Sequence, residues 1–152
     1  MSEYSQLLLE NQLCFRIYTL HRKVMALYKP LLDELGITYL QYITLMILWK
    51  DGEQKVSDIC SKTDIDVGTI SPMLKRMEKN NLLVRTRDSI DERIVKISLT
   101  LKGEEMKEKA VSVPHAISSC FVENSVGDDK QKIESIANLF DSFIDIVKSC
   151  DK

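Results

Sequence analysis

Residues 66–83 read DVGTISPMLKRMEKNNLL, and this stretch decides the fold. Its apolar residues recur at helical spacing, which predicts a helix with one buried face: Ile70, Met73, Leu74 and Met77. The helix either begins at Pro72 with Ser71 as its N-cap, or begins nearer Val67 and loses one backbone hydrogen bond at the proline. The polar side chains lie largely off the apolar face, so one side of the helix is left for a partner.

The segments on both sides of this helix predict a second helix and a β-hairpin. A short helix is expected at 57–62, followed by a turn at 63–66. After the longer helix come two runs with period-2 alternation, 83–87 and 94–100, joined by a charged turn. Helix, turn, helix and hairpin form a winged helix-turn-helix, which places its second helix in the major groove of DNA and its hairpin tip against the backbone or the minor groove.

Two segments at this separation resemble the MarR family of bacterial repressors. The first is the stretch 66–83, and the second is DERIVKISLTLKG at 91–103. The second segment fits the family's wing pattern, D-x-R-x-x-x-[IVL]-x-L-T-x-x-G, at every specified position. The resemblance covers nearly the whole chain and implies a homodimer that acts on a roughly palindromic site in double-stranded DNA.

Candidate DNA contacts follow from the exposed side of the helix and from the wing. Base edges or adjacent phosphates in the major groove are the expected targets of Thr69, Ser71, Pro72 and Lys75, and the DNA backbone is the expected target of Arg76. The wing motif of the family implies that Arg93 reaches the minor groove, with Asp91 orienting it. Arg85 and Arg87, on the first wing strand, are expected to contact phosphates.

The distribution of charge agrees with a DNA-binding segment. The chain of 152 residues has a net charge of -2, which taken alone argues against nucleic acid. Residues 68–102 nevertheless hold eight Lys or Arg against four Asp or Glu, while both flanking regions are net negative. The positive charge is therefore concentrated where phosphate contacts need it.

The fold class predicted is mainly α (α+β), in one domain spanning 1–152, with the winged head at about 38–100 and a dimerisation region made of about 1–35 and 104–150. Residues 5–32 are expected to form one helix with two adjacent apolar stripes, which indicates burial against a second subunit. Thr38 and Gln41 have the spacing of a capping box for a helix that ends near Gly52. Thr100 is expected to cap a helix that Pro114 kinks or divides.

Cys14 is the candidate reactive residue. A free cysteine is usually a small buried hydrophobe, but the segment Asn11-Gln12-Leu13-Cys14-Phe15 resembles the reactive-cysteine segment of the organic hydroperoxide resistance regulators, a peroxide-sensing branch of the family. The resemblance implies that Tyr28 and Tyr39 accompany the thiol. Fourteen helical residues span about 21 Å, so Tyr28 must approach Cys14 of another chain. With a helix start near Ser5, Cys14 lies about three turns in, where the helix dipole adds little.

Cys120 is a candidate resolving cysteine. Some members of the branch carry only the sensing cysteine and need a small external thiol, whereas others form a disulfide across the dimer with a second cysteine about a hundred residues later. Cys120 follows Cys14 by 106 residues and fits the second type. The alternative is a half-buried helix cysteine, and Cys60 is expected to pack inside its helix.

Other classes of protein find little support in the sequence. No signal peptide or membrane-spanning run is visible, so a cytoplasmic protein with reduced cysteines is expected. No cysteine or histidine spacing predicts a metal, and no cofactor motif is present. We therefore expect a repressor, not an enzyme, that releases DNA when an oxidant such as an organic hydroperoxide modifies Cys14. The alternatives are a MarR-type repressor released by a small aromatic or anionic ligand, and a thiol peroxidase.

Overall fold

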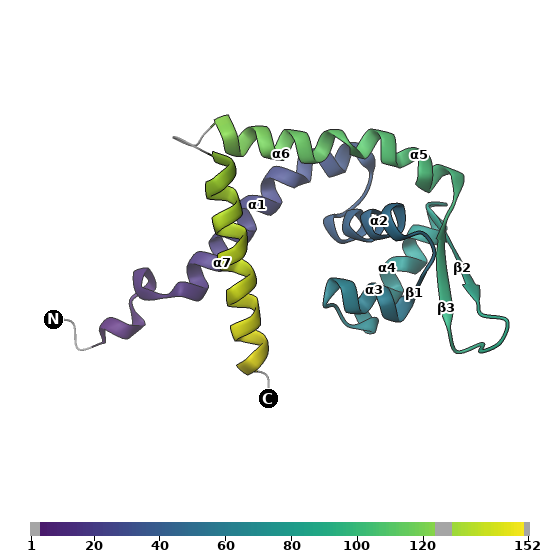
Figure 1. The fold of residues 1–152 in the computed structure, drawn as a ribbon, viewed down its shortest axis with the longest axis horizontal. Coiled ribbons are helices and arrows are strands. Elements are labelled where there is room, and N and C mark those ends of the chain that lie inside the picture. Colours follow the sequence, from purple (N-terminus) through teal and green to yellow (C-terminus); the bar gives the residue numbers. More distant parts are fainter. Residues whose placement is uncertain (1–3, 124–128, 151–152) are drawn as a thin grey trace. The chain divides into compact units, whose positions relative to one another are not determined.

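Residues 4–123 and 129–150 are described by the computed structural model. The chain forms two units, residues 1–114 and residues 115–152. The first unit is mainly helical with a small antiparallel sheet (Figure 1). Its elements are η1 (Ser5–Leu7), η2 (Leu9–Asn11), α1 (Leu13–Leu35), α2 (Tyr39–Asp51), β1 (Gln54–Lys55), α3 (Val56–Thr63), α4 (Val67–Lys79), β2 (Leu83–Arg87), β3 (Val95–Leu99) and α5 (Leu101–Ala110). Helix α6 (Ser112–Glu123) runs across the boundary, and α7 (Asp129–Cys150) lies in the second unit.

The winged helix-turn-helix predicted from the sequence is present. Helices α3 and α4 are joined by the turn at 64–66, and β2 and β3 pair antiparallel with Arg85 opposite Ile97. The two-residue strand β1 was not predicted, and it pairs with β3 on the other side, giving the strand order β1-β3-β2. The mainly α fold class with a small sheet is therefore confirmed.

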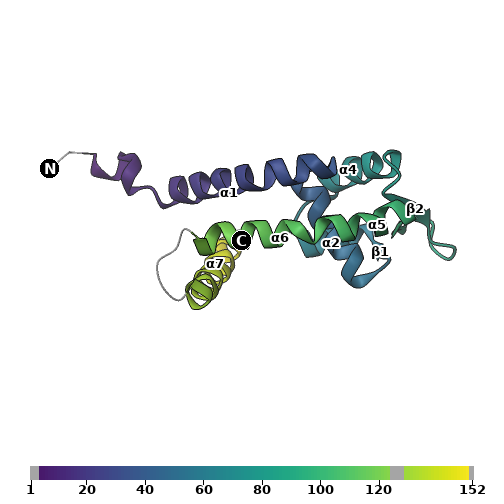
Figure 2. The ribbon, with the colours of Figure 1, turned by 90° about the horizontal axis from the view of Figure 1, so that it is seen from above.

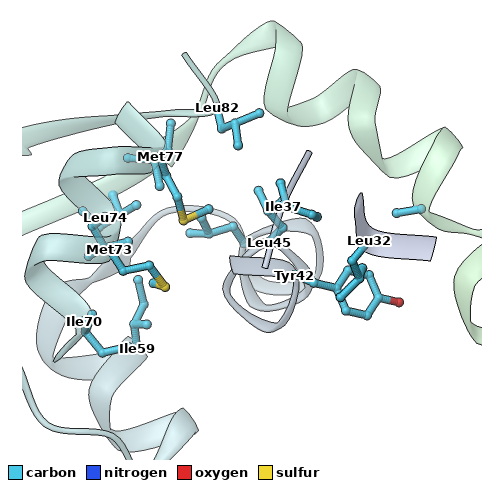
Figure 3. Packing of buried hydrophobic residues seen from close by; sticks show 14 of the residues in the cluster. Leu32, Ile37, Tyr42, Leu45, Ile59, Ile70, Met73, Leu74, Met77 and Leu82 are labelled. Atoms are coloured by element: carbon cyan, nitrogen blue, oxygen red, sulfur yellow. The ribbon is translucent and has the colours of Figure 1, made fainter. Parts of the chain in front are cut away.

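The core of the first unit lies among α2, α3 and α4 (Figure 3). All four apolar positions predicted on the second helix are buried, with Ile70, Leu74 and Met77 fully inaccessible. Leu45 from α2 and Ile59 from α3 are also fully buried. Burying side chains of this size is the main favourable term that holds the three helices together.

Helix α4 takes the longer of its two possible forms. Its N-cap is Asp66, whose carboxylate accepts the backbone N–H of Thr69 at 3.0 Å and the hydroxyl of Thr69 at 2.9 Å. These hydrogen bonds hold the pKa of Asp66 below its usual range. Pro72 therefore lies inside the helix, at the cost of the one bond its missing N–H cannot make.

The other predicted caps are confirmed. Thr38 and Gln41 form a reciprocal capping box at α2, and Gly52 ends that helix with a positive φ of 70°. Thr100 accepts the backbone N–H of Gly103 at the start of α5. The helix after the wing divides at Val111, so Pro114 falls in the first turn of α6, where a missing N–H costs no helical bond.

The expected single helix over 5–32 is wrong at its start. The α-helix begins at Leu13, and two short 3-10 turns precede it (Figure 2). Amide side chains explain the interruption, because Asn11 donates to the carbonyl of Ser5 and Gln12 donates to the carbonyl of Gln6. Such local side-chain bonds compete with helical ones. Gln12 stays extended as the N-cap of α1.

Large apolar side chains are exposed on two helices. On α1 they include Leu13 at 53%, Leu20 at 45% and Leu27 at 37% accessible, and on α7 they include Leu139 at 70%.

No single helix within residues 4–123 and 129–150 is long and apolar enough to cross a membrane; only α1 and α2 together pass that test, as a pair bent by 70°.

Gly103 joins the winged head to α5. The indole N–H of Trp49 donates to the carbonyl of Gly103 at 2.9 Å, and the backbone N–H of Thr100 donates to the carbonyl of Leu82 at 3.2 Å. A β-carbon on Gly103 would overlap that same Leu82 oxygen. The glycine of the wing motif is thus required by a close approach of two backbones.

Replacing Gly103 tests the close approach of its backbone to the Leu82 carbonyl. In an ordinary helix, Gly→Ala stabilises by about 1 kcal/mol, but Gly103→Ala should lower the free energy of unfolding by about 1–3 kcal/mol because the β-carbon forces the backbones apart. Urea denaturation measures the change, and Glu105→Ala on the exposed side of the same helix should shift it by less than about 0.5 kcal/mol. A stabilised Gly103→Ala protein would contradict the close approach.

Candidate DNA-binding surface and thiol site

The exposed face of α4 carries most of the predicted major-groove contacts. Thr69, Pro72, Lys75 and Arg76 are exposed and Ser71 is half-buried. The hydroxyl of Thr69 already donates to the N-cap carboxylate, which leaves its methyl group and its oxygen lone pairs for DNA. Within the described residues, Lys75 and Arg76 form no ion pair, so their charges remain available to phosphates.

The wing presents its arginines in three different ways. Arg93 is exposed in the turn between β2 and β3, and its backbone N–H donates to a carboxylate oxygen of Asp91 at 3.0 Å. Asp91 therefore positions the backbone of Arg93 and not its guanidinium. Arg87 donates to the carbonyl of Glu92 at 3.4 Å, while Arg85 is half-buried with its guanidinium 3.8 Å from a carboxylate oxygen of Glu78.

Asp88 organises the wing turn and was missed in the sequence. One carboxylate oxygen accepts the backbone N–H groups of Ile90 and Asp91 at 2.9 and 3.1 Å. The other oxygen pairs with Lys96 at 2.6 Å. This hydrogen bond from Lys96, followed by those from the two backbone N–H groups, holds the pKa of Asp88 far below its usual range. The D-x-x-D spacing of the turn is the signal that would have identified an Asx turn here.

Cys14 lies in a different place from the one expected. It is the second residue of α1, exposed in the first turn, and not three turns into a helix. The first backbone N–H groups of a helix have no intrahelical partner, and the helix dipole favours an anion there. The first turn therefore exposes the Cys14 side chain beside backbone N–H groups that have no helical acceptor.

The two predicted tyrosines are brought together. The rings of Tyr28 and Tyr39 meet edge to face with centroids 4.8 Å apart, and Tyr42 lies 6.5 Å from both. Burial raises the pKa of Tyr28, and the neighbouring Tyr39 adds to the effect. Its hydroxyl therefore stays protonated at neutral pH and can donate a hydrogen bond. Tyr42 was not foreseen, because its spacing on α2 reads as core.

A hollow of about 220 Å³ opens beside the tyrosine pair. Its lining is Met25, Tyr28, Lys29, Leu32, Asp33, Ile37, Thr38 and Tyr39. Lys29 and Asp33 form an exposed ion pair at 2.6 Å along α1. The chain thus offers two phenol groups on the wall of an open, largely apolar hollow.

The described chain does not bring Cys14 to this hollow. Cys14 and Tyr28 belong to the same helix, fourteen residues apart, which is about 21 Å of rise. Cys120 lies half-buried on α6. In the part of the chain that the structure describes, no group of three or more His, Cys, Asp or Glu is placed to hold a metal.

Comparisons with known proteins add two relatives and a family model. Residues 26–110 match the model described as transcriptional regulator SarA/Rot. The organic hydroperoxide resistance transcriptional regulator of Bacillus subtilis (strain 168) is 42% identical over 134 residues, covering 88% of this chain and 90% of that protein. Reduced AbfR bound to DNA has a TM-score of 0.81 at 32% identity and covers 98% of this chain and 99% of that one.

AbfR, a protein of Staphylococcus epidermidis, is also known in two oxidised forms. Overoxidized AbfR bound to DNA has a TM-score of 0.69 at 33% identity, over 91% of this chain and 96% of that one. Disulfide-formed AbfR has a TM-score of 0.64 at 34% identity, over 91% of this chain and 94% of that one.

The role of Asp88 in holding Arg93 can be tested by a double-mutant cycle. Arg93→Ala should cost about 1–3 kcal/mol of DNA binding if the guanidinium reads the groove. Asp88→Ala should lose part of the same free energy, because the turn that presents Arg93 is released. In the Arg93→Ala background, Asp88→Ala should then cost almost nothing further, whereas fully additive losses would show that Asp88 does not act through Arg93.

The same carboxylate predicts a pH dependence of the wing. Because the folded pKa of Asp88 is lowered, its contribution to stability is complete above the ordinary Asp range near 3.9 and is lost only as the pH falls through the lower folded value. Protection of the Ile90 and Asp91 amide protons from exchange should therefore persist at pH 4. At pH 4 and above it should be absent in Asp88→Ala and the same as wild type in Ser89→Ala.

Proposed function

Because the chain belongs to the MarR/SarA family of transcriptional regulators, we propose that it is a homodimeric repressor whose operator binding is controlled by oxidation of Cys14. The family consists of DNA-binding transcriptional regulators and not of enzymes, so a thiol peroxidase is excluded. Within the family, the chain falls in the redox-sensing branch of its AbfR and hydroperoxide-resistance relatives. Acting on operator DNA places the protein in the bacterial cytoplasm.

The observation that carries this proposal is the position of Cys14. Within its own chain the thiol is exposed in the first turn of α1 and not enclosed in the core, on the helix whose exposed apolar residues would meet a second subunit. A cysteine with a purely structural role is usually buried.

A second copy of the chain would complete the site. The exposed apolar residues of α1 and α7 fit a homodimer interface, and obligate interfaces of this kind commonly bury more than about 2,000 Å². Cys14 of one subunit would then meet Tyr28 and Tyr39 of the other at the hollow described above. The two hydroxyls would donate hydrogen bonds to the thiolate and hold it ready for reaction.

The chemistry would run in two balanced steps. The Cys14 thiolate attacks the terminal oxygen of an organic hydroperoxide, the O–O bond breaks, and the products are a sulfenic acid and, after protonation, an alcohol. The thiol of Cys120 in the other subunit then displaces water from the sulfenic sulfur and forms a disulfide. The two cysteines are oxidised by two electrons and the hydroperoxide is reduced by two.

Disulfide formation offers a reason for release from DNA. A disulfide requires Cα atoms within roughly 7 Å. We expect these atoms to lie farther apart in the reduced dimer, so closing the bond would move the helices that carry the two cysteines. Recognition helices of a dimer must stay about 34 Å apart to match one turn of DNA. Structures of AbfR show its reduced and overoxidised forms bound to DNA and, separately, a disulfide form, a pattern that supports a disulfide as the releasing state of the present chain.

The hollow beside Tyr28 also favours a second candidate function. A volume of about 220 Å³ lined mainly by aromatic and aliphatic side chains suits a small aromatic ligand, and an anionic one would be met by Lys29 if it left its pair with Asp33. Such a ligand would release the repressor without thiol chemistry. The two functions differ in their response to oxidant.

A titration of DNA binding against cumene hydroperoxide distinguishes them. The DNA is a site selected by the reduced protein from a random-sequence library. Wild type should lose binding at about one oxidant per Cys14 and recover it with dithiothreitol, because the disulfide is reversible. It should also run as a covalent dimer in non-reducing electrophoresis.

Single-cysteine variants assign the steps. Cys14→Ser should stay on DNA whatever the oxidant, and Cys120→Ser should give no covalent dimer. Cys150→Ser, which changes an exposed thiol near the end of α7, should behave as wild type. Full reversible release by Cys120→Ser without an added thiol would exclude the two-cysteine mechanism, and indifference of wild type to oxidant would favour the ligand-released repressor.

A further inference from the structure

An open groove of about 530 Å³ lies between α3, α4 and the wing. It is lined by Lys55, Val56, Ser57, Cys60, Val67, Ser71, Arg85, Arg93, Ile94 and Val95. We propose that this groove holds one phosphate group of the DNA backbone and that Lys55 is one of its contacts. Lys55 lies outside the positively charged stretch 68–102, from which the other DNA contacts were predicted.

The charges of the lining all have one sign. Lys55 comes from the N-cap of α3, Arg85 from β2 and Arg93 from the wing turn, and no carboxylate lines the groove. Among the described residues, Lys55 and Arg93 form no ion pair. A concave surface with three cations from three separate elements favours an anion.

Arg85 supplies an independent observation. Its Nε is buried and has no hydrogen-bond partner within the described chain. Its guanidinium is held at the wall of the groove by Glu78, whose carboxylate also accepts the backbone N–H of Arg85 at 3.1 Å. Buried donors in native proteins nearly always have an acceptor. The buried Nε is not itself open to the groove, but Arg85 lines the groove and its guanidinium is held by one carboxylate at 3.8 Å, so its terminal N–H groups can donate to a phosphate oxygen.

The path of DNA over a winged helix-turn-helix leads a backbone strand to this place. With α4 in the major groove and the wing in the adjacent minor groove, the strand that separates the two grooves must pass between them. The described groove occupies that interval. The hydroxyl of Ser71, on α4, lies at the same lining and can donate to the phosphate as well.

The salt dependence of DNA binding by the reduced protein tests the proposal. It depends on DNA binding by the family and not on the thiol chemistry, so failure of either leaves the other intact. Each phosphate contact contributes about 0.9 to the slope of log K against log salt concentration. Lys55→Ala removes one contact from each of two heads and should make the slope shallower by roughly 1.8. Lys55→Arg should keep the wild-type slope.

Lys62→Ala is the matched control. Lys62 lies on the same helix and its removal changes the net charge equally, but its ammonium pairs with Asp51 at 2.7 Å and with the side chain of Gln54 at 2.7 Å. Its slope should equal that of wild type. A Lys55→Ala slope equal to that of wild type, with a folded protein by circular dichroism, would overturn the proposal.

Operator duplexes with single uncharged phosphates identify the phosphate that Lys55 contacts. In a set of operator duplexes, each phosphate in turn is replaced by an uncharged methylphosphonate. Wild type and Lys62→Ala should lose affinity at one position per half-site between the major-groove and minor-groove segments. Lys55→Ala should lose clearly less there, because only Arg85, Arg93 and Ser71 remain to hold the phosphate, while its losses at the other contacted positions stay those of wild type. Equal losses for Lys55→Ala and wild type at every position would show that Lys55 holds no phosphate.

Discussion

Cys14 and Tyr28 lie on one continuous helix, and fourteen residues of α-helix keep them about 21 Å apart. Tyr28 is also fixed from the other side, because its ring packs against Tyr39 on α2. No rearrangement short of breaking α1 brings the thiol to the phenols of its own chain. The proposed sensor therefore depends on a second subunit, and the exposed apolar residues along α1 provide the surface on which that subunit would lie.

The same rigidity would carry a change at the thiol to the DNA. Helix α1 packs on α2, and α5 is joined to the winged head at Gly103. There the Leu82 carbonyl leaves no room for a side chain, and the Trp49 indole donates to the Gly103 carbonyl. The wing in turn is held by Asp88, which binds two backbone N–H groups and Lys96. Each head would then move as a body, so a displacement of a few ångströms at the dimer interface alters the spacing of two recognition helices that must match about 34 Å of DNA.

Much of this structure could be predicted from the sequence. The helix of 67–79 was readable from its apolar period and its flanking turn, although its start was left open between Pro72 and Val67, and the wing strands were readable from their alternation. The start of α1 was not, because Asn11 and Gln12 fit a helix by pattern but bond to carbonyls behind them. Strand β1 is too short for any pattern, and the pairing of Asp88 with Lys96 joins residues whose contact depends on the hairpin register. The thiol site is the least predictable part. The family resemblance pointed to Cys14, Tyr28 and Tyr39, but contact between the thiol and the tyrosines depends on a second chain.

Mixed dimers test the shared site most directly. One preparation pairs a Cys14→Ser subunit with a Tyr28→Phe subunit, and the other pairs a subunit carrying both substitutions with a wild-type subunit. If the site is shared, the first dimer keeps one complete site, made of Cys14 from the Tyr28→Phe subunit and Tyr28 from the other, whereas the second keeps none. The rate of sulfenic acid formation with cumene hydroperoxide should then approach that of a wild-type site only in the first dimer. A fast reaction in the second dimer and a slow one in the first would show that Cys14 and Tyr28 act within one chain, contrary to this account.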